Sequence, residues 1–457
     1  MSEGAAKKEE KPRKFQAIRG TRDLLPPETA LWNRVEQTAH EVFATFGFGE
    51  IRPPIFEPTD LFARAVGGET DIVSKEMYTF SNPTGLAAMV HESRTEGMLS
   101  DMLLSEAEMI SLRPEATASV CRAYIEHSMQ QLPQPVKLYY MGPMFRRERP
   151  QKGRYRQFYQ IGAEVLGGSD APAIDAEVIE MVMTFFNRLG LEGVQLHINS
   201  IGDKNCRPRY VELLREELRK VKDKLGPDSQ RRIDTNPLRV LDSKLESEQE
   251  TIEKLPRITQ HLCDSCRDNY DEVKRQLAIR GIIYSQNFRL VRGLDYYMRT
   301  TFEITAKGLG SQNAVCGGGR YDGLVELLGG SPTKGIGFAI GEDRLILSLQ
   351  ESGKAPVAEG PEVYIAWMGE NAQATAIRAA KDLRKAGFSV ELPPVEQKFG
   401  KALGQADKLG AKYALILGDN EVSEGLWTLK TLADGSQAKF TEPGLLGHLR
   451  KSKAVSS

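Results

Sequence analysis

Hydrophobic residues recur at helical spacing after the N-terminal tail, at Leu31, Val35, Val42, Phe43 and Phe46. A Pro-Pro-Glu start at 26–28 and Gly47 bound this pattern, so it predicts one amphipathic helix. The segment that follows, 50–55, contains two prolines. Because the residue before a proline is disfavoured in the α region, we expect this segment to be extended.

The same periodicities predict further elements in the middle of the chain. From about Gly202 to Arg280 the sequence becomes charged and helical, and we interpret this stretch as a small helical insertion. Residues 335–347 indicate a strand that leads into a helix, with Arg344 near the helix start. The other predicted helices are 175–189, 211–225 and 270–279, and the other predicted strands are 195–198, 288–291 and 301–304.

A linker around 351–361 precedes a separate unit in which strands and helices alternate. This alternation is typical of a parallel or mixed sheet with helices packed against it. The predicted order is strand 363–367, helix 372–386, a strand at Val390, helix 400–409 and strand 413–417.

The composition is that of an ordinary globular protein, with 40% hydrophobic and 27% charged residues among 457. That length allows roughly three domains. Since the net charge is −1, any nucleic-acid surface must be local. Residues 1–14 mix Lys with Glu and predict a disordered tail that is not a signal peptide. No apolar stretch predicts a membrane span, and the five cysteines in so long a chain indicate a reducing, cytoplasmic location.

The most informative segment is cationic. Between Arg146 and Arg156 lie six basic residues and one acid, flanked on both sides by apolar residues. This pattern predicts two strands joined by a basic loop. Guanidinium groups there suit phosphate oxygens, because their planar fork matches them and stays charged. The alternative is a solvated basic hairpin, since charge runs usually face water.

Two glycine-containing runs indicate a second part of a site: Leu-Val-Arg-Gly-Leu-Asp-Tyr-Tyr at 290–297 and Cys-Gly-Gly-Gly-Arg-Tyr-Asp-Gly at 316–323. Glycines weaken a strand unless something must approach its backbone closely, so a ligand lying against the sheet is one interpretation. A glycine-rich turn beside core tyrosines is the other. Neither the dinucleotide-binding nor the P-loop glycine pattern occurs.

Three cysteines fall in the helical insertion, Cys206, Cys263 and Cys266. A Cys-x-x-Cys pair with one distant cysteine falls short of four zinc ligands. We therefore favour leftover or packing cysteines, and metal binding by these three cysteines remains the less favoured alternative.

Taken together, these segments resemble the histidyl-tRNA synthetases, a family of class II aminoacyl-tRNA synthetases. The similarity runs from about Phe15 to Leu446. The three class II signatures correspond to 50–57 around Pro54, to 145–160 and to 335–345, and the runs 290–297 and 316–323 look peculiar to the histidine enzymes. The insertion is similar at 199–202 and 236–242.

The resemblance implies an α+β fold: an antiparallel-sheet catalytic domain with a helical insertion, followed by a C-terminal α/β anticodon-binding domain. It also implies a homodimer with the segment around Pro54 at the interface. The expected boundaries are a tail at 1–14, a catalytic domain at 15–201 and 281–350, an extra insert at 82–111, the helical insertion at 202–280 and the anticodon-binding domain at 361–450.

The implied reaction is the ATP-dependent ligation of L-histidine to tRNA(His) through a histidyl-adenylate, with Mg²⁺ offsetting phosphate charge. Such chemistry needs cations more than acid–base groups. By resemblance, Arg146 and Arg292 are the catalytic residues. The residues implied to bind ATP are Arg146, Glu148, Arg154, Phe158 and Arg344.

The same resemblance implies a set of residues around the histidine substrate: Glu115, Thr117, Gln160, Glu164, Arg292, Tyr296, Tyr297 and Tyr321. Polar partners buried around an imidazole reject analogues strongly, because a wrong side chain leaves them unpaired. At the tip of the basic loop, Arg149, Gln151 and Lys152 are implied to contact the tRNA acceptor end.

Alternatives remain at this point. The insert 82–111 is interpreted as a solvated hairpin or helical excursion, and less often as a mobile flap near the histidine site. A catalytically silent regulatory subunit of histidine biosynthesis would lack the anticodon-binding domain and have eroded motifs. A synthetase for proline or threonine would share the C-terminal fold, but the 290–296 run weighs against it.

Overall fold

The computed structural model describes residues 14–456 except 69, 83–107, 295, 308–312 and 354–359. These residues divide into two compact units. One consists of residues up to 355 without Pro26–Ala30, and the other of Pro26–Ala30 with the residues from 356 on. The predicted tail at 1–14 lies almost wholly outside the described residues.

An eight-stranded sheet forms the centre of the larger unit. Its order is β1-β5-β6-β11-β10-β9-β7-β8, and the strands are antiparallel except at the edge pairs β1·β5 and β7·β8. The bounds are β1 Gly49–Glu50, β5 Val136–Phe145, β6 Gln157–Leu166, β7 Gln195–Ser200, β8 Tyr284–Gln286, β9 Met298–Thr305, β10 Ala314–Arg320 and β11 Gly335–Gly341. The predicted class of fold, an antiparallel-rich sheet with helices, is confirmed.

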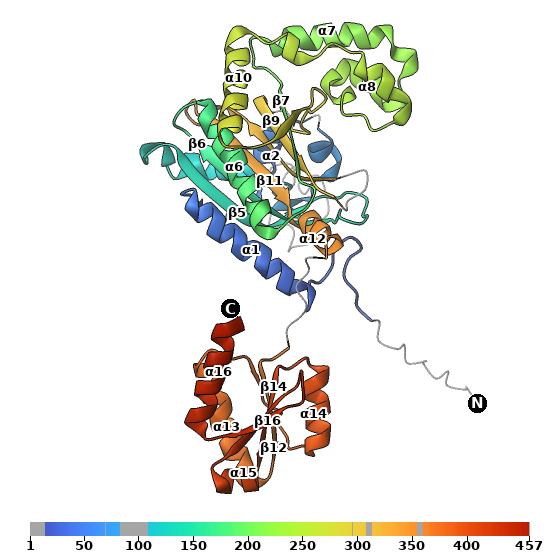
Figure 1. The fold of residues 1–457 in the computed structure, drawn as a ribbon. Coiled ribbons are helices and arrows are strands. Elements are labelled where there is room, and N and C mark those ends of the chain that lie inside the picture. The colour runs from blue at the N-terminus through green and yellow to red at the C-terminus, as the bar shows by residue number, and fades with distance from the viewer. Residues whose placement is uncertain are drawn as a thin grey trace, which may run out of the picture. The chain divides into compact units, whose positions relative to one another are not determined.

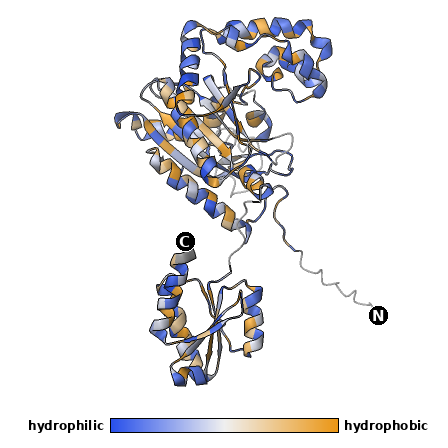
Figure 2. Ribbon diagram, in the orientation of Figure 1, coloured by the Kyte–Doolittle hydropathy of each residue, from blue (hydrophilic) through white to orange (hydrophobic). Residues whose placement is uncertain are grey.

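Helices cover one face of this sheet, where the main core lies. They are α1 Glu28–Thr45, α6 Pro172–Leu189, α10 Asp264–Ile279 and α12 Glu342–Glu351. Figure 1 shows α1 and α6 running beside the strands, and Figure 2 shows hydrophilic and hydrophobic residues alternating along α1. Helix α1 buries the apolar stripe that its spacing predicted, including Leu31, Val35 and Phe43.

The opposite face is covered only in part, by α2 Thr59–Val66, α5 Thr117–Glu126 and α11 Leu324–Leu327. Because side chains alternate across a strand, β6 sends Ile161, Ala163 and Val165 into the main core. Its residues of opposite parity, among them Phe158, Gln160 and Glu164, lie on the other face. This face carries the candidate site.

A small sheet, in the order β2-β4-β3, lies beside this region. Its strands are β2 Phe56–Pro58, β3 Thr79–Asn82 and β4 Glu108–Leu112, so the two ends of the predicted insert 82–111 pair with each other as antiparallel strands. The rest of that insert lies outside the described residues. Single turns Ile72–Glu76 and Met129–Gln131 complete this part.

The predicted helical insertion has its own core, built on Tyr210, Leu214, Ile233 and Val240. It begins with α7 Arg207–Lys220, continues through α8 Pro227–Thr235 and α9 Gln249–Glu253, and returns to the sheet through α10. Short turns connect the helices at Lys222–Lys224, Pro237–Val240, Glu246–Glu248 and Ile258–Gln260. Figure 1 shows α7 and α8 grouped at the end of α10.

The predicted strand at 288–291 is wrong. The sheet instead gains β8 at Tyr284–Gln286, and residues 287–297 run as irregular chain where they are described. The amide of Asn199 donates to the carbonyls of Phe288 (3.3 Å) and Leu290 (3.1 Å). The apolar run is therefore explained by packing, because Leu290 and Val291 are buried away from a strand ladder.

The smaller unit has a mixed five-stranded sheet in the order β13-β12-β14-β15-β16. Strands β13, β12 and β14 are parallel, and β15 and β16 are antiparallel. Helices α13 and α16 pack on one face and α14 on the other. The bounds are β12 Val363–Met368, α13 Glu370–Lys385, β13 Val390–Glu391, α14 Phe399–Lys408, β14 Tyr413–Gly418, α15 Asp419–Glu424, β15 Trp427–Thr431, β16 Gln437–Phe440 and α16 Glu442–Ser456.

Among the described residues, no helix has the length and apolar character that a bilayer crossing requires.

A buried ion pair ties β10 to α6. The side chains of Arg320 and Asp175 are 1% and 0% exposed, and Arg320 Nη1 also lies 3.0 Å from Asp322 Oδ1. Arg320 therefore faces the protein interior. Arg320, the arginine of the 316–323 run, is therefore structural. The arginine that lies against the glycines of this run is Arg292.

We predict that Arg320→Ala lowers the free energy of unfolding by about 3–5 kcal/mol, because Asp175 would stay buried without its counter-charge. Urea denaturation of the purified protein measures this change. Lys254→Ala, which removes an exposed ion pair with Glu250, is the matched control and should leave the midpoint unchanged. Equal midpoints for the two variants would contradict the prediction.

Candidate active site

A pocket of about 320 Å³ opens on the partly covered face of the eight-stranded sheet. Its volume is at the lower end of the range of small-molecule sites. Most of the residues that the sequence nominated line this pocket together: Glu115, Thr117, Arg146, Glu148, Arg154, Phe158, Gln160, Arg292, Tyr296, Tyr297 and Arg344.

Three of the arginines form a cationic cluster. Arg146 follows β5 and lies over the ring of Phe158 at 5.2 Å, Arg154 comes from the loop between β5 and β6, and Arg344 stands in the first turn of α12. Burial lowers the pKa of Arg344, and the charge of Arg154 lowers it further. Positive charges held this close together favour a polyanionic ligand.

One carboxylate lies within this cluster. Glu148 is 3.8 Å from Arg146 and 3.5 Å from Arg154, measured between carboxylate oxygens and guanidinium nitrogens. Arg146 also donates to the carbonyl of Pro114 at 2.9 Å, which fixes its guanidinium relative to the start of α5.

Arg292 enters from the irregular segment before β9 and lies flat against the glycine strand. A Cβ atom on Gly317 would be only 2.1 Å from its guanidinium, so the glycine is required for this close approach. Nη1 is 3.3 Å from Glu303 Oε2, but the buried Nε has no hydrogen-bond partner. An anionic ligand in the pocket would supply one.

The other end of the pocket is acidic and buried. Glu115 accepts the backbone N–H groups of Thr117 (2.7 Å) and Ala118 (3.0 Å) at the start of α5. Behind it, Glu164 accepts the hydroxyls of Thr117 (2.7 Å) and Tyr321 (2.5 Å). Burial raises the pKa of Glu164 to about 8, against these hydrogen bonds. Burial raises the pKa of Glu115 as well.

Gln160 marks the boundary between the cationic and acidic ends. Its Oε1 is buried and has no hydrogen-bond partner, which is unusual for a buried acceptor and points to a ligand donor. The tyrosines stand nearby, with the ring centroids of Tyr296 and Tyr297 at 4.7 Å and those of Tyr296 and Tyr321 at 5.7 Å.

Not every nominated residue reaches the pocket wall. Glu164 and Tyr321 lie just behind it and bond to each other. Arg149, Gln151 and Lys152 are exposed on the loop between β5 and β6, and Lys152 pairs with Glu351 at 3.0 Å. Sequence reasoning missed Glu303, whose position in β9 opposite in parity to Phe302 and Ile304 could have indicated it.

The comparisons with known proteins agree with this geometry. A family model described as "Histidyl-tRNA synthetase" matches residues 91–345, and one described as "Anticodon binding domain" matches 362–451. The chain is 52% identical to a Solibacter usitatus (strain Ellin6076) protein named "Histidine--tRNA ligase", over 95% of this chain and 99% of that one. A protein of the same name from Koribacter versatilis (strain Ellin345) is 50% identical, over 96% and 97%.

The chain belongs to the histidyl-tRNA synthetase family. A crystal structure of apo S. aureus histidyl-tRNA synthetase has a TM-score of 0.75 and 36% identity, covering 95% of this chain and 99% of that one. The predicted family, fold class and enzyme class, a histidine–tRNA ligase, are confirmed. The anticodon-binding match at 362–451 favours the synthetase over the regulatory subunit, which lacks that domain.

The raised pKa of Glu164 predicts a pH-dependent stability. Glu164 ionises near 4.5 in the unfolded chain and at about 8 in the folded protein, so its contribution is full below the lower value and is lost as the pH rises through the higher one. From about pH 5 to about pH 8.5, wild type should lose on the order of 4 kcal/mol relative to Glu164→Gln.

Urea midpoints across this range measure the difference, with Glu326→Gln on the exposed surface as control. Parallel pH profiles for wild type and Glu164→Gln would show that Glu164 is ionised in the folded protein and would contradict the prediction.

Proposed function

We propose that this ligase activates histidine with ATP in the pocket described above, with the nucleotide at the cationic end and the amino acid at the acidic end. The observation that carries this proposal is the convergence of Arg146, Arg292 and Arg344 on one pocket, next to the unpartnered acceptor of Gln160. A carboxylate and a nucleoside triphosphate are the two anions that such a site would bring together.

In the first step, the carboxylate of histidine attacks the α-phosphorus of ATP in line with the departing pyrophosphate. The barrier depends on stabilising negative charge on phosphate oxygens. Arg146 would hold the α-phosphate, and Arg154 and Arg344 the outer phosphates. Phe158 would stack on the adenine and Glu148 would accept its amino group. The pairing of Arg146 with Phe158 already presents both groups to one ligand.

Arg292 is proposed to bridge the two substrates. Its guanidinium lies between Gly317 and the pocket, with Nε unpartnered. From there it would contact the substrate carboxylate and the α-phosphate, and so hold two negative groups at reacting distance. Its position against a glycine backbone leaves it little freedom to move, which is the condition for preorganised charge stabilisation.

Histidine recognition is assigned to the acidic end. The ammonium would donate to Glu115, Thr117 and the free acceptor of Gln160. The imidazole needs a donor and an acceptor, for which Glu164 and Tyr297 are proposed, with Tyr296 and Tyr321 alongside. A Glu164 side chain whose pKa is raised to about 8 by burial can hold a proton at neutral pH. Because it lies just behind the pocket wall, its proposed role is exerted through the hydroxyls of Thr117 and Tyr321 that it accepts.

The pocket offers few carboxylate ligands for Mg²⁺, as expected for an ion that binds mainly to the phosphates of a nucleotide. Four described pocket residues carry carboxylates: Glu115, Glu148, Glu303 and Asp343. Glu115 and Asp343 already accept backbone N–H groups, so Glu148 and Glu303 are the candidates. Mg²⁺ on a nucleotide is held by one or two carboxylates, phosphate oxygens and water. When bound, the ion would neutralise phosphate charge, while the arginines orient the triphosphate.

In the second step, a hydroxyl at the 3′ end of tRNA(His) attacks the histidyl carbonyl and AMP departs. Arg149, Gln151 and Lys152 are proposed to position the acceptor end, because they are exposed beside the pocket on a basic loop. Contacts of this kind place the backbone without reading sequence. The unit from about 361 to 450 would bind the anticodon.

The homodimer is also a proposal. Ile55 and Phe56 are 43% and 57% exposed next to Pro54, and Arg113 holds this segment by donating to the carbonyl of Pro53 at 2.8 Å. A rigid segment that exposes apolar side chains suits an interface. We retain the boundaries 15–201, 202–280 and 281–350 for the catalytic domain and its insertion, and a cytoplasmic location, as predictions.

One prediction tests the role of Arg292 in the activation of histidine by ATP. Arg292→Ala should reduce histidine-dependent exchange of pyrophosphate into ATP by about 10²–10³-fold or more, because one transition-state donor is lost. The protein should keep its circular dichroism spectrum. Arg149→Ala, outside the pocket, is the control and should exchange normally. Unchanged exchange in Arg292→Ala would remove Arg292 from the mechanism, and exchange supported by proline instead of histidine would refute the assigned substrate.

The second prediction separates the two steps. Because Arg149 and Lys152 lie outside the pocket, the double variant Arg149→Ala/Lys152→Ala should raise KM for tRNA(His) in aminoacylation, roughly tenfold, and KM should become less sensitive to salt. Pyrophosphate exchange should be unaffected. A loss of exchange, or an unaltered KM for tRNA, would contradict the role proposed for this loop.

A further inference from the structure

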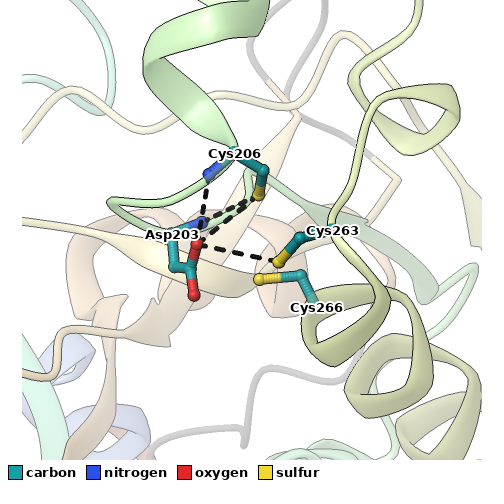
Figure 3. A group of neighbouring side chains, drawn as sticks. All are labelled: Asp203, Cys206, Cys263 and Cys266. Atoms are coloured by element: carbon teal, nitrogen blue, oxygen red, sulfur yellow. Dashed lines mark hydrogen bonds between the residues drawn. The ribbon is translucent and has the colours of Figure 1, made fainter.

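Four side chains with metal-ligating atoms converge where the chain leaves the large sheet for the helical insertion. They are Asp203, Cys206, Cys263 and Cys266, and one ligand atom from each lies within 4.8 Å of all the others. Figure 3 shows the three sulfur atoms and the carboxylate pointing toward a common centre. The three cysteines were noted in the sequence, and the fold brings the carboxylate of Asp203 to them as a fourth ligand group.

The four ligands form two pairs, Asp203 with Cys206 and Cys263 with Cys266. In each pair two residues lie between the ligands, and each pair lies at the start of a helix. Asp203 follows β7, and Cys206 is the residue before α7. Cys263 precedes α10, and Cys266 lies in its first turn. The backbone N–H of Asp203 is 3.5 Å from Cys206 Sγ. Pairs separated by two residues are the spacing that zinc sites use.

The cluster is buried but reachable. Asp203, Cys206 and Cys266 are buried, and Cys263 is half-buried. The thiols of Cys206 and Cys263 make long contacts to Asp203 Oδ1, at 3.5 Å and 3.9 Å, and the thiol of Cys266 contacts Asp203 and the other two thiols. Asp203 Oδ1 also accepts the backbone N–H groups of Asn205 at 2.9 Å and Cys206 at 3.4 Å, which hold the carboxylate beside the three thiols.

A positive side chain offsets part of the charge such a site would carry. Arg299 Nη2 is 3.8 Å from Asp203 Oδ2, and Nη1 is 2.8 Å from Asp170. Three thiolates and one carboxylate around a divalent ion leave a net charge of −2, which Arg299 would offset in part while it also pairs with Asp170. The backbone of Arg299 is fixed as well, since its N–H donates to the carbonyl of Gly202 at 2.7 Å.

We propose that Asp203, Cys206, Cys263 and Cys266 bind one structural Zn²⁺ ion. Three soft thiolates select zinc over hard cations such as Mg²⁺, and four protein ligands leave no open position for catalysis. The ion cross-links the first and last parts of the insertion. It also sits beside a contact to the pocket, because Arg207, next to Cys206, donates to the carbonyl of Tyr297 at 2.7 Å.

The first test is metal content. Protein purified under reducing conditions with zinc in the growth medium should hold about one zinc per chain by elemental analysis. Cys263→Ser and Cys266→Ser should weaken zinc affinity by about 100-fold or more. Asp203→Cys should retain the ion, because a thiolate replaces the carboxylate. Cys121→Ala removes a buried cysteine outside the cluster and should retain it too.

The second test does not depend on variants that must fold. Zinc is removed from the wild-type protein with a chelator, and Co²⁺ is added. Tetrahedral thiolate ligation should give an intense near-ultraviolet charge-transfer band and visible d–d bands, and zinc should abolish both. Zinc should also raise the unfolding temperature of the metal-free protein.

Absence of bound zinc together with absence of a thiolate–cobalt spectrum would overturn the proposal. So would zinc retained undiminished in Cys263→Ser and Cys266→Ser, because the ion would then be held elsewhere.

Discussion

The site depends on ionisable side chains that are buried against the sheet at glycine positions. At these positions no side chain of the sheet fills the space. Arg292 occupies the space where Gly317 would carry a Cβ, and Glu164 occupies the corresponding space at Gly337. The protein compensates for this burial with hydrogen bonds to Glu164 and with Glu303 beside Arg292. Any side chain on these glycines would displace the groups that define the pocket.

The two ends of the pocket differ in charge because they are built from different elements. The cationic end comes from the basic loop and from α12, and the acidic end from the start of α5 and from β6. Burial raises the pKa of Glu164 and lowers that of Arg344, so burial disfavours the charged form of a side chain at each end. Perturbed groups of this kind cluster at functional sites. This division supports the proposal that the nucleotide and the amino acid bind at opposite ends of the pocket.

The insertion contributes to the site through packing. Tyr297 lines the pocket and also belongs to the core of the insertion, and Arg207 binds its carbonyl. The cluster of Asp203, Cys206, Cys263 and Cys266 lies next to Arg207, at the junction of the sheet and the insertion. The conformation of this junction therefore affects the position of Tyr297 in the pocket. No residue of the cluster itself lines the pocket.

Much of the fold could be read from periodicity, since helix α1 has the spacing of an amphipathic helix and strand β6 sends alternate residues to opposite faces of the sheet. The spacing of Phe158, Gln160 and Glu164 places them on one face of β6 by parity alone. The strand expected at 288–291 was wrong because the apolar residues serve packing: Val291 belongs to the core of the insertion and Leu290 is buried outside a strand. Asp203 was missed for a related reason, because an aspartate near one cysteine signals nothing until the chain brings two others to it.

The sequence by itself determined the kinds of chemistry available: arginines for phosphate, buried carboxyls for an amino acid, and glycines where the backbone must be approached. Only the tertiary structure decided which of them meet. Thr117 and Glu164 are 47 positions apart and Glu164 and Tyr321 are 157 apart, and local periodicity carries no information about contacts made across such distances.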